Sequence, residues 1–126
     1  KVIIDVGHNP HAAKYLAEKL TALKTQISGR IIAVCGMLKD KDAESVFNQL
    51  TSVIDQWYCV TLGGYRGQSG DDLNAKLTTV CPSAKSVSED SVAEGVQSAV
   101  KNADKNDIVL VFGSFHTVGE FLEYLA

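Results

Sequence analysis

The chain has 126 residues, of which 45% are hydrophobic and 21% charged, and its formal net charge is −3. A chain of this length is expected to form one domain that buries roughly two-thirds of its unfolded surface, so it can build a core without disulfides or metals. The slight negative charge and the lack of a basic stripe argue against nucleic-acid binding. No signal peptide and no apolar run of membrane-spanning length is present.

The cysteines Cys35, Cys59 and Cys81 are far apart in the sequence and odd in number. None belongs to a C-x-x-C pair, so the sequence does not support a zinc or redox motif. Cys35 and Cys59 lie in apolar strand-like runs, where cysteine behaves as a small hydrophobic residue. We therefore expect reduced thiols in a cytoplasmic protein, and no metal ligands in this chain.

Strand-like segments alternate with segments of helical spacing along the whole chain. This alternation predicts βαβ units and a Rossmann-like α/β fold, with a mostly parallel sheet of five or six strands and helices on both faces. The second and fifth segments are almost continuously apolar, which predicts central strands covered on both faces. The predicted strands are Lys1–Asp5, Arg30–Gly36, Gln56–Leu62, Ala84–Val87 and Asp107–Gly113.

Residues that favour helix N-termini precede each helical segment. Asn, Ser, Thr and Asp side chains accept hydrogen bonds from the first backbone N–H groups of a helix, and Pro fits its first position. A Glu three residues later completes a capping box. The predicted starts are Asn9-Pro10, Asp40 or Asp42, Ser69, Ser91 with Glu94, and Thr117 with Glu120.

The loop after the first strand has two interpretations. Asp, Gly, Asn and Pro are common turn residues, so the loop is explained as a turn alone. His8, however, is not required by any turn geometry. Loops at the carboxyl ends of parallel strands bind ligands, and helix N-termini attract anions. Asp5 and His8 are therefore candidates for a nucleotide or phosphate site.

Ser114 follows the last strand directly after Gly113, and His116 comes two residues later. The G-x-S-x-G pattern of a nucleophile elbow is absent, which argues against serine-hydrolase chemistry. Two alternatives remain open: Ser114 caps the last helix, or its hydroxyl and nearby backbone N–H groups hold a substrate carboxylate.

A glycine-rich loop, residues 63–67, follows the third strand and carries Arg66. Arg66 is either solvated or a bidentate clamp for a carboxylate or phosphate. Neither G-x-x-x-x-G-K-[ST] nor a G-x-G-x-x-G after a strand occurs in the chain. We therefore do not expect this chain to activate ATP by itself.

Three motifs together resemble the C-terminal domain of the bacterial folylpolyglutamate synthase/dihydrofolate synthase family, within the Mur ligase superfamily. They are D-V-G-H-N-P-H-A-A at residues 5–13, V-C-G-M-L-K-D-K-D at residues 34–42 and V-F-G-S-F-H-T-V at residues 111–118. They follow the family's order and spacing over essentially the whole chain. Two departures occur: Gly7 stands where the family often has Ala, and Tyr65-Arg66 where many members have Pro-Arg.

The resemblance implies an ATP-dependent amide ligase. Members phosphorylate a carboxylate of dihydropteroate or a folate, and the amine of L-glutamate then attacks the acyl phosphate. It implies ATP contacts from Asp5, His8 and Asn9, with Asp5 at the ribose, and glutamate contacts from Ser114 and His116. The P-loop and the Mg²⁺ ligands are expected in a preceding domain, and Lys1 directly before a strand suggests a piece of a longer protein.

Two other functions remain as alternatives. One is a Mur-type peptidoglycan amino-acid ligase domain, which shares the first motif. The other is a non-catalytic nucleotide-binding or signalling module with a parallel α/β fold, which does not explain the three motifs. In each reading we expect neither nucleic-acid nor membrane partners.

Overall fold

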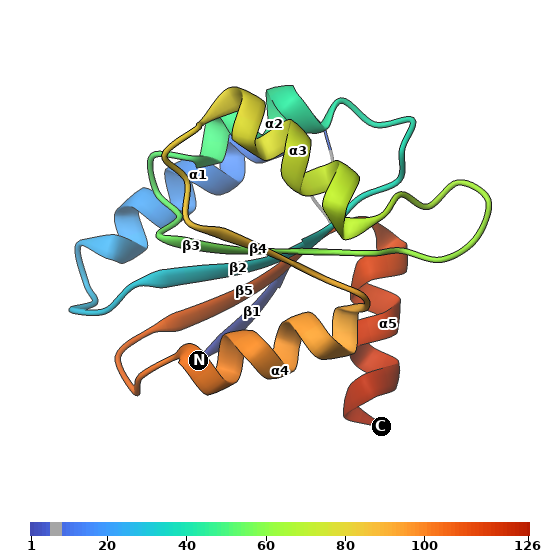
Figure 1. Ribbon diagram of the computed structural model, residues 1–126. Coiled ribbons are helices and arrows are strands. Elements are labelled where there is room, and N and C mark those ends of the chain that lie inside the picture. The colour runs from blue at the N-terminus through green and yellow to red at the C-terminus, as the bar shows by residue number, and fades with distance from the viewer. Residues whose placement is uncertain (6–8) are drawn as a thin grey trace.

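The computed structural model describes residues 1–5 and 9–126. Strands and helices alternate along the chain (Figure 1). They are β1 (Val2–Asp5), α1 (Pro10–Lys24), β2 (Ile31–Gly36), α2 (Ala43–Leu50), β3 (Gln56–Val60), α3 (Gly70–Val80), β4 (Ser86–Glu89), α4 (Val92–Asn102), β5 (Ile108–Gly113) and α5 (Phe115–Leu125).

The described strands form one five-stranded sheet in the order β1-β5-β2-β3-β4, and all four neighbouring pairs are parallel. Helices α1, α2 and α3 cover one face, and α4 and α5 cover the other (Figure 1). Right-handed crossovers explain this division. The chain steps in one direction from β1 through β4 and then returns, so that β5 enters between β1 and β2. The predicted Rossmann-like α/β class is confirmed.

The predicted strand bounds are confirmed to within two residues. The largest difference is β4, which lies at Ser86–Glu89 and not at Ala84–Val87. The N–H of Ala84 bonds to the carbonyl of Cys81 at 3.0 Å, so this residue closes a turn before the strand begins. β3 ends at Val60, two residues earlier than predicted, and the N–H of Leu62 already bonds to the carbonyl of Gln68.

The sheet separates two apolar layers. Trp57 lies in the layer under α1–α3, where its ring meets Phe47 edge-on at 5.2 Å and Phe112 at 6.1 Å between centroids. The strands β2 and β5 are buried at every position. Their continuous apolar pattern therefore identified the two central strands correctly, because a strand covered on both faces needs no polar side.

The helix starts agree with the sequence at four of five positions. Ser69 and Ser91 accept a hydrogen bond from the N–H of the third residue of their helices, as Asn9 does at α1. Of the two alternatives for α2, Asp42 is the cap. The predicted box at Thr117 and Glu120 is wrong, because α5 begins three residues earlier with Ser114 as its cap.

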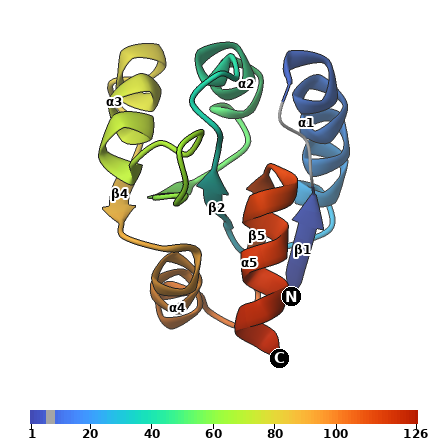
Figure 2. The same cartoon turned by 90° about the vertical axis from the view of Figure 1, so that its right-hand side faces the viewer.

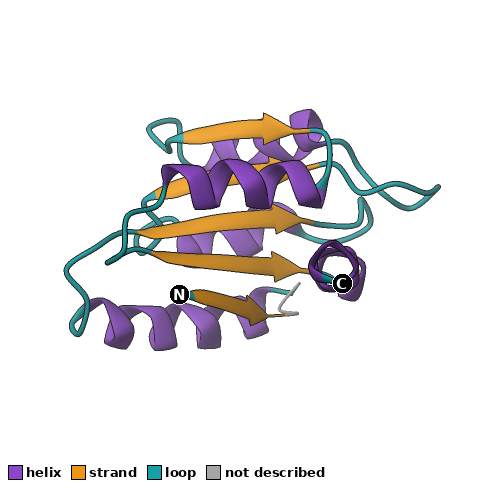
Figure 3. Ribbon diagram, turned by 90° about the horizontal axis from the view of Figure 1, so that it is seen from below, coloured by secondary structure: helices purple, strands orange, loops and turns teal. Residues whose placement is uncertain are grey.

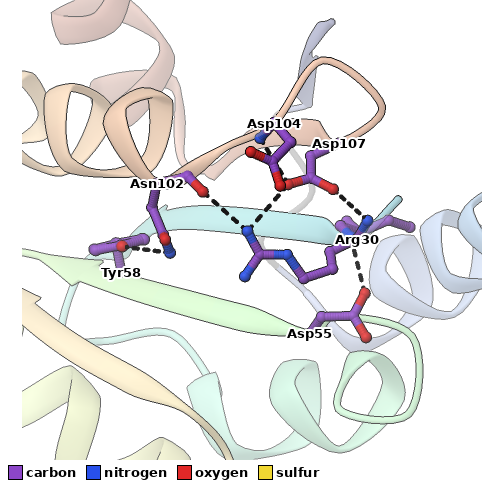
Figure 4. A network of polar contacts seen from close by, with 7 residues as sticks. Arg30, Asp55, Tyr58, Asn102, Asp104 and Asp107 are labelled. Carbon is purple, nitrogen blue, oxygen red and sulfur yellow. Dashed lines mark hydrogen bonds and ion pairs between the residues drawn. The ribbon is translucent and has the colours of Figure 1, made fainter. Parts of the chain in front are cut away.

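Two carboxylates fix the amino ends of the central strands (Figure 4). Asp107 is buried and accepts hydrogen bonds from the N–H of Arg30 at 2.7 Å, from the N–H of Asp104 at 2.9 Å and from the Arg30 guanidinium at 3.0 Å. Asp55 accepts from the N–H of Ile31 at 2.8 Å. These bonds satisfy backbone donors at the strand starts that would otherwise lack partners.

Candidate functional site

The connections of neighbouring strands diverge at the carboxyl edge of the sheet. The chain leaves β1 and β2 towards the face that carries α1 and α2, whereas it leaves β5 towards α5 on the opposite face (Figure 2). In open α/β sheets such a point, where adjacent connections go to opposite faces, forms the ligand-binding crevice. The topology therefore points to the ends of β1, β5 and β2.

The register brings two predicted site residues to this point. Asp5 pairs with Phe112, and Gly36 pairs with Gly113, so Ser114 follows at the same edge. Figure 3 shows α5 nearly end-on beside the tips of the strands. Asp5 is half-buried, whereas Ser114 is buried. Residues 109 positions apart in sequence thus lie on neighbouring strand ends.

Asn9 and Pro10, which belong to the same motif as Asp5, lie at the start of α1. Asn9 is exposed, and its side-chain oxygen accepts the N–H of Ala12 at 2.8 Å, which makes it a helix cap. This contact leaves the Asn9 side-chain NH₂ as a donor. The candidate His8 lies outside the described residues. The predicted helix start is therefore confirmed, and the predicted nucleotide contact of Asn9 stays a prediction.

Ser114 is joined to the end of β2 through Thr117. The Thr117 hydroxyl donates to the carbonyl of Gly36 at 2.8 Å, and its oxygen accepts from the N–H of Ser114 at 3.4 Å. The two hydroxyl oxygens are 3.3 Å apart, and the Ser114 oxygen accepts the N–H of Thr117 at 3.3 Å. Because a hydroxyl has one proton and Thr117 gives it to Gly36, Ser114 is the donor between the two side chains.

Gly113 makes this arrangement sterically feasible. Its φ is +139°, and a Cβ added there would come within 1.8 Å of the carbonyl oxygen of Gly36. Only glycine accepts both the left-handed backbone and the close approach. The turn therefore requires glycine at position 113, and Ser114 is confirmed as the cap of α5.

His116 lies in the first turn of α5 and is exposed. Partial burial and the neighbouring Glu123 raise the pKa of Glu120 above its ordinary value, and His116 opposes this shift. The imidazole thus stands beside a carboxylate one helical turn away, on the same side of the helix. It remains accessible to a ligand at the sheet edge.

The loop with Arg66 is tied to the loop after β2. Leu38 and Gly67 form an antiparallel bridge, and the guanidinium of Arg66 is 2.5 Å from the carboxylate of Asp40. This hydrogen bond holds the pKa of Asp40 below its ordinary value. Of the two readings for Arg66, neither describes it fully: the side chain is half exposed and paired with a carboxylate of the chain itself.

Gln68 is a buried polar residue that the sequence did not single out. Its amide donates to the carbonyls of Met37 and Leu38 at 3.2 and 3.3 Å, and its oxygen accepts from Lys76 at 3.0 Å. It therefore fastens the Arg66 loop to the second motif. No local pattern identifies such a residue, because its partners lie about 30 positions away.

A groove of about 380 Å³ borders Asp5 but does not lead to Ser114. Its lining is mainly apolar and includes Ile4, Leu16 and Leu23. Since α1 runs back along the sheet, Leu23 lies towards the amino ends of the strands. The groove is thus separate from the ends of β5 and β2.

Within residues 1–5 and 9–126, no group of three His, Cys, Asp or Glu residues is placed to hold a metal ion. Over the same ranges, no helix combines the length and the apolar character needed to cross a bilayer.

Residues 1–115 match the family described as "Mur ligase, glutamate ligase domain". The chain belongs to this family of glutamate ligase domains. The match covers the first two motifs completely and the third as far as residue 115, and it includes Asp5 and Ser114. The resemblance inferred from the motifs is confirmed.

Relatives within this family are dihydrofolate synthase/folylpolyglutamate synthases. The chain is 68% identical to that protein of Haemophilus influenzae over 120 residues, which cover 95% of the chain and 28% of the relative. Identity to the Escherichia coli protein is 44%, over 99% of the chain and 28% of the relative. The chain thus spans little more than a quarter of these proteins, and it corresponds to their C-terminal domain.

Solved structures give the same assignment. Escherichia coli FolC in complex with DHPP and ADP matches with a TM-score of 0.89 and 44% identity, covering 98% of this chain and 28% of that one. A bifunctional folylpolyglutamate synthase/dihydrofolate synthase with Mn, AMPPNP and L-glutamate bound matches with a TM-score of 0.82 and 40% identity, over the same shares of the two chains. The fold of this glutamate ligase domain is therefore that of the folate enzymes.

Proposed function

We propose that this chain serves as the C-terminal domain of an ATP-dependent ligase that adds L-glutamate to dihydropteroate, to folates, or to both. The observation that carries the proposal is the placement of Asp5 and Ser114 on neighbouring strand ends of a domain 68% identical to such an enzyme. The reaction would take place in the cytoplasm, in keeping with three unpaired thiols among the described residues.

On the nucleotide side, the carboxylate of Asp5 would accept hydrogen bonds from the ribose hydroxyls of ATP. A ribose presents two adjacent O–H donors, and an ionised carboxylate is purely an acceptor. His8 and Asn9 would contribute to the same side at the N-terminus of α1. Strand β1 fixes the position of Asp5 through its pairing with β5.

On the glutamate side, Ser114 and His116 would contact the incoming amino acid at the N-terminus of α5. Glutamate carries two carboxylates, and the positive end of a helix dipole favours such a ligand. Ser114 gives its hydroxyl proton to Thr117, so its oxygen would accept a hydrogen bond from the amino group of glutamate rather than donate one to a carboxylate, while His116 is exposed beside it. These residues would position the amine of glutamate for attack, and positioning of this kind contributes much of the rate enhancement.

The sequence of this chain contains no phosphate-binding P-loop motif. A preceding domain would supply the P-loop and the Mg²⁺ ligands, and Mg²⁺ would stabilise phosphate charge there. The present domain would close over the acyl phosphate and keep water from hydrolysing it. The domain alone is therefore expected to be inactive.

We expect Asp5→Ala, in the full-length protein, to raise the KM for ATP on the order of tenfold, which corresponds to about 1.4 kcal/mol of lost binding. The KM for glutamate should change little, because Asp5 faces the nucleotide. Steady-state kinetics with each substrate varied in turn measure both constants. An unchanged KM for ATP would remove Asp5 from the ribose site.

We expect Ser114→Ala to raise the KM for glutamate by roughly tenfold, while the KM for ATP stays within a factor of about two. The variant also loses the cap of α5, which costs about 1 kcal/mol of stability, so its Tm should be recorded beside its kinetics. An effect confined to ATP would assign Ser114 to the nucleotide instead. Assays with dihydropteroate and with a UDP-muramoyl peptide separate the folate activity from the peptidoglycan alternative.

A further inference from the structure

We propose that Thr117 is a positioning residue for glutamate and acts only through Ser114. This inference rests on the proposed role of Ser114 as a glutamate contact. Thr117 is completely buried and therefore unable to meet a substrate itself. Its hydroxyl nevertheless joins three parts of the site: the end of β2, the residue after β5 and the first turn of α5.

The contacts fix both the location and the orientation of the Ser114 side chain. Thr117 donates to the carbonyl of Gly36, the residue paired with Gly113, across 81 positions of sequence. It then accepts from both the backbone N–H and the hydroxyl of Ser114. The Ser114 oxygen in turn accepts the N–H of Thr117. Ser114 is thus held at both its main chain and its side chain.

The hydroxyl of Thr117 lies close to two glycines, Gly36 and Gly113. A Cβ added at Gly36 would lie 2.9 Å from Oγ1 of Thr117, and one added at Gly113 would lie 3.2 Å from it. The hydroxyl therefore packs against both glycines, and a side chain at either position would crowd it. A side chain of the same shape without the oxygen fills this space but does not hold Ser114.

The test uses Thr117→Val in the full-length protein, because valine keeps the shape and removes the hydroxyl. We expect the KM for glutamate to rise several-fold, towards that of Ser114→Ala, while the KM for ATP remains unchanged. Thr117→Ser, which restores the oxygen, should return the KM for glutamate to near the original value. If Thr117→Val does not yield folded protein, Thr117→Ala removes the same hydroxyl without adding volume.

The double variant decides whether Thr117 acts through Ser114. If it does, adding Thr117→Val to Ser114→Ala leaves the KM for glutamate where Ser114→Ala alone put it, since interacting residues are non-additive. If the two substitutions act independently, their effects on the KM for glutamate multiply in the double variant, and that result would overturn the inference. So would an equal rise in both KM values, or no rise with Thr117→Val alone.

Thr61→Val is the matched control. Thr61 lies after β3 at the same edge of the sheet, and its hydroxyl oxygen accepts the N–H of Gly70 at 2.8 Å. Among the described residues, Thr61 forms no hydrogen bond with Ser114. We expect this variant to lower the Tm and to leave the KM for glutamate unchanged. If Ser114→Ala itself leaves that KM unchanged, the proposed function loses its glutamate contact and the inference falls with it. A clear effect of Ser114→Ala with none of Thr117→Val overturns the inference alone.

Discussion

Gly113→Ala should be the most damaging single substitution at the sheet edge, with a loss of about 3–5 kcal/mol in the free energy of unfolding. Alanine at φ +139° is strained, and its Cβ would lie 1.8 Å from the carbonyl oxygen of Gly36. Relief requires the ends of β5 and β2 to separate, which also breaks the contact between Thr117 and Gly36. Urea unfolding of the 126-residue chain, followed by circular dichroism, measures the loss.

Gly119→Ala is the control for this substitution. Gly119 lies inside α5, and a Cβ there would meet no atom within 4 Å. Alanine is the better helix former, so the free energy of unfolding of this variant should rise by about 0.5–1 kcal/mol. If Gly113→Ala lowers the free energy of unfolding by no more than about 1 kcal/mol, the strand ends can relax around a side chain and the prediction is wrong.

Asp107→Asn should lower the free energy of unfolding by about 2–4 kcal/mol, since hydrogen bonds to a buried charged group are among the stronger ones. The carboxylate accepts from the N–H of Arg30, the N–H of Asp104 and the guanidinium of Arg30. The amide of Asn has only one oxygen that can accept these hydrogen bonds. Its NH₂ group is a donor and would face other donors, with which it cannot bond. Thermal and urea unfolding at neutral pH measure the cost, and Asp104→Asn is the control, because it makes the same change on an exposed neighbour.

The same carboxylate gives the stability a defined pH dependence. The hydrogen bonds from the N–H groups of Arg30 and Asp104 hold the pKa of Asp107 below its ordinary value. The unfolded chain therefore binds this proton more tightly than the folded one. The contribution is present above the ordinary Asp pKa of about 3.9 and is lost as the pH falls through the lower pKa of the folded state. Asp107→Asn should lose less stability over that acidic range than the unchanged chain does, and equal losses would contradict this role.

The sequence predicted those parts of the fold whose pattern follows from burial. β2 and β5 are buried throughout, so an unbroken apolar run marked them. β4 is an edge strand of mixed polarity, Ser86–Glu89, and its start is set by pairing with β3. Nothing in its own residues distinguishes it from the preceding turn, which explains the shift of two residues.

The sequence predicted which residues of the candidate site lie at strand ends, but not which of those strand ends are neighbours in the sheet. Asp5 and Ser114 were identified because each lies where an apolar strand ends. Their proximity depends on the insertion of β5 beside β1, which no local pattern reveals. The role of Thr117 was missed for the same reason: its decisive partner, Gly36, is 81 residues away. The misplaced cap of α5 arose because Thr117-x-x-Glu120 and Ser114-x-x-Thr117 are both plausible from sequence.

The position of β5 has a consequence for how the chain is made. β5 is the last strand to be synthesised, yet it pairs with both β1 and β2, which are not neighbours of each other. Until it emerges from the ribosome, β1 has no partner and one side of β2 is open. Contacts between segments this distant form slowly and leave unpaired strand edges in the meantime. The sheet can therefore close only after β5 has left the ribosome, and until then the edges that it covers remain open to pairing with other chains.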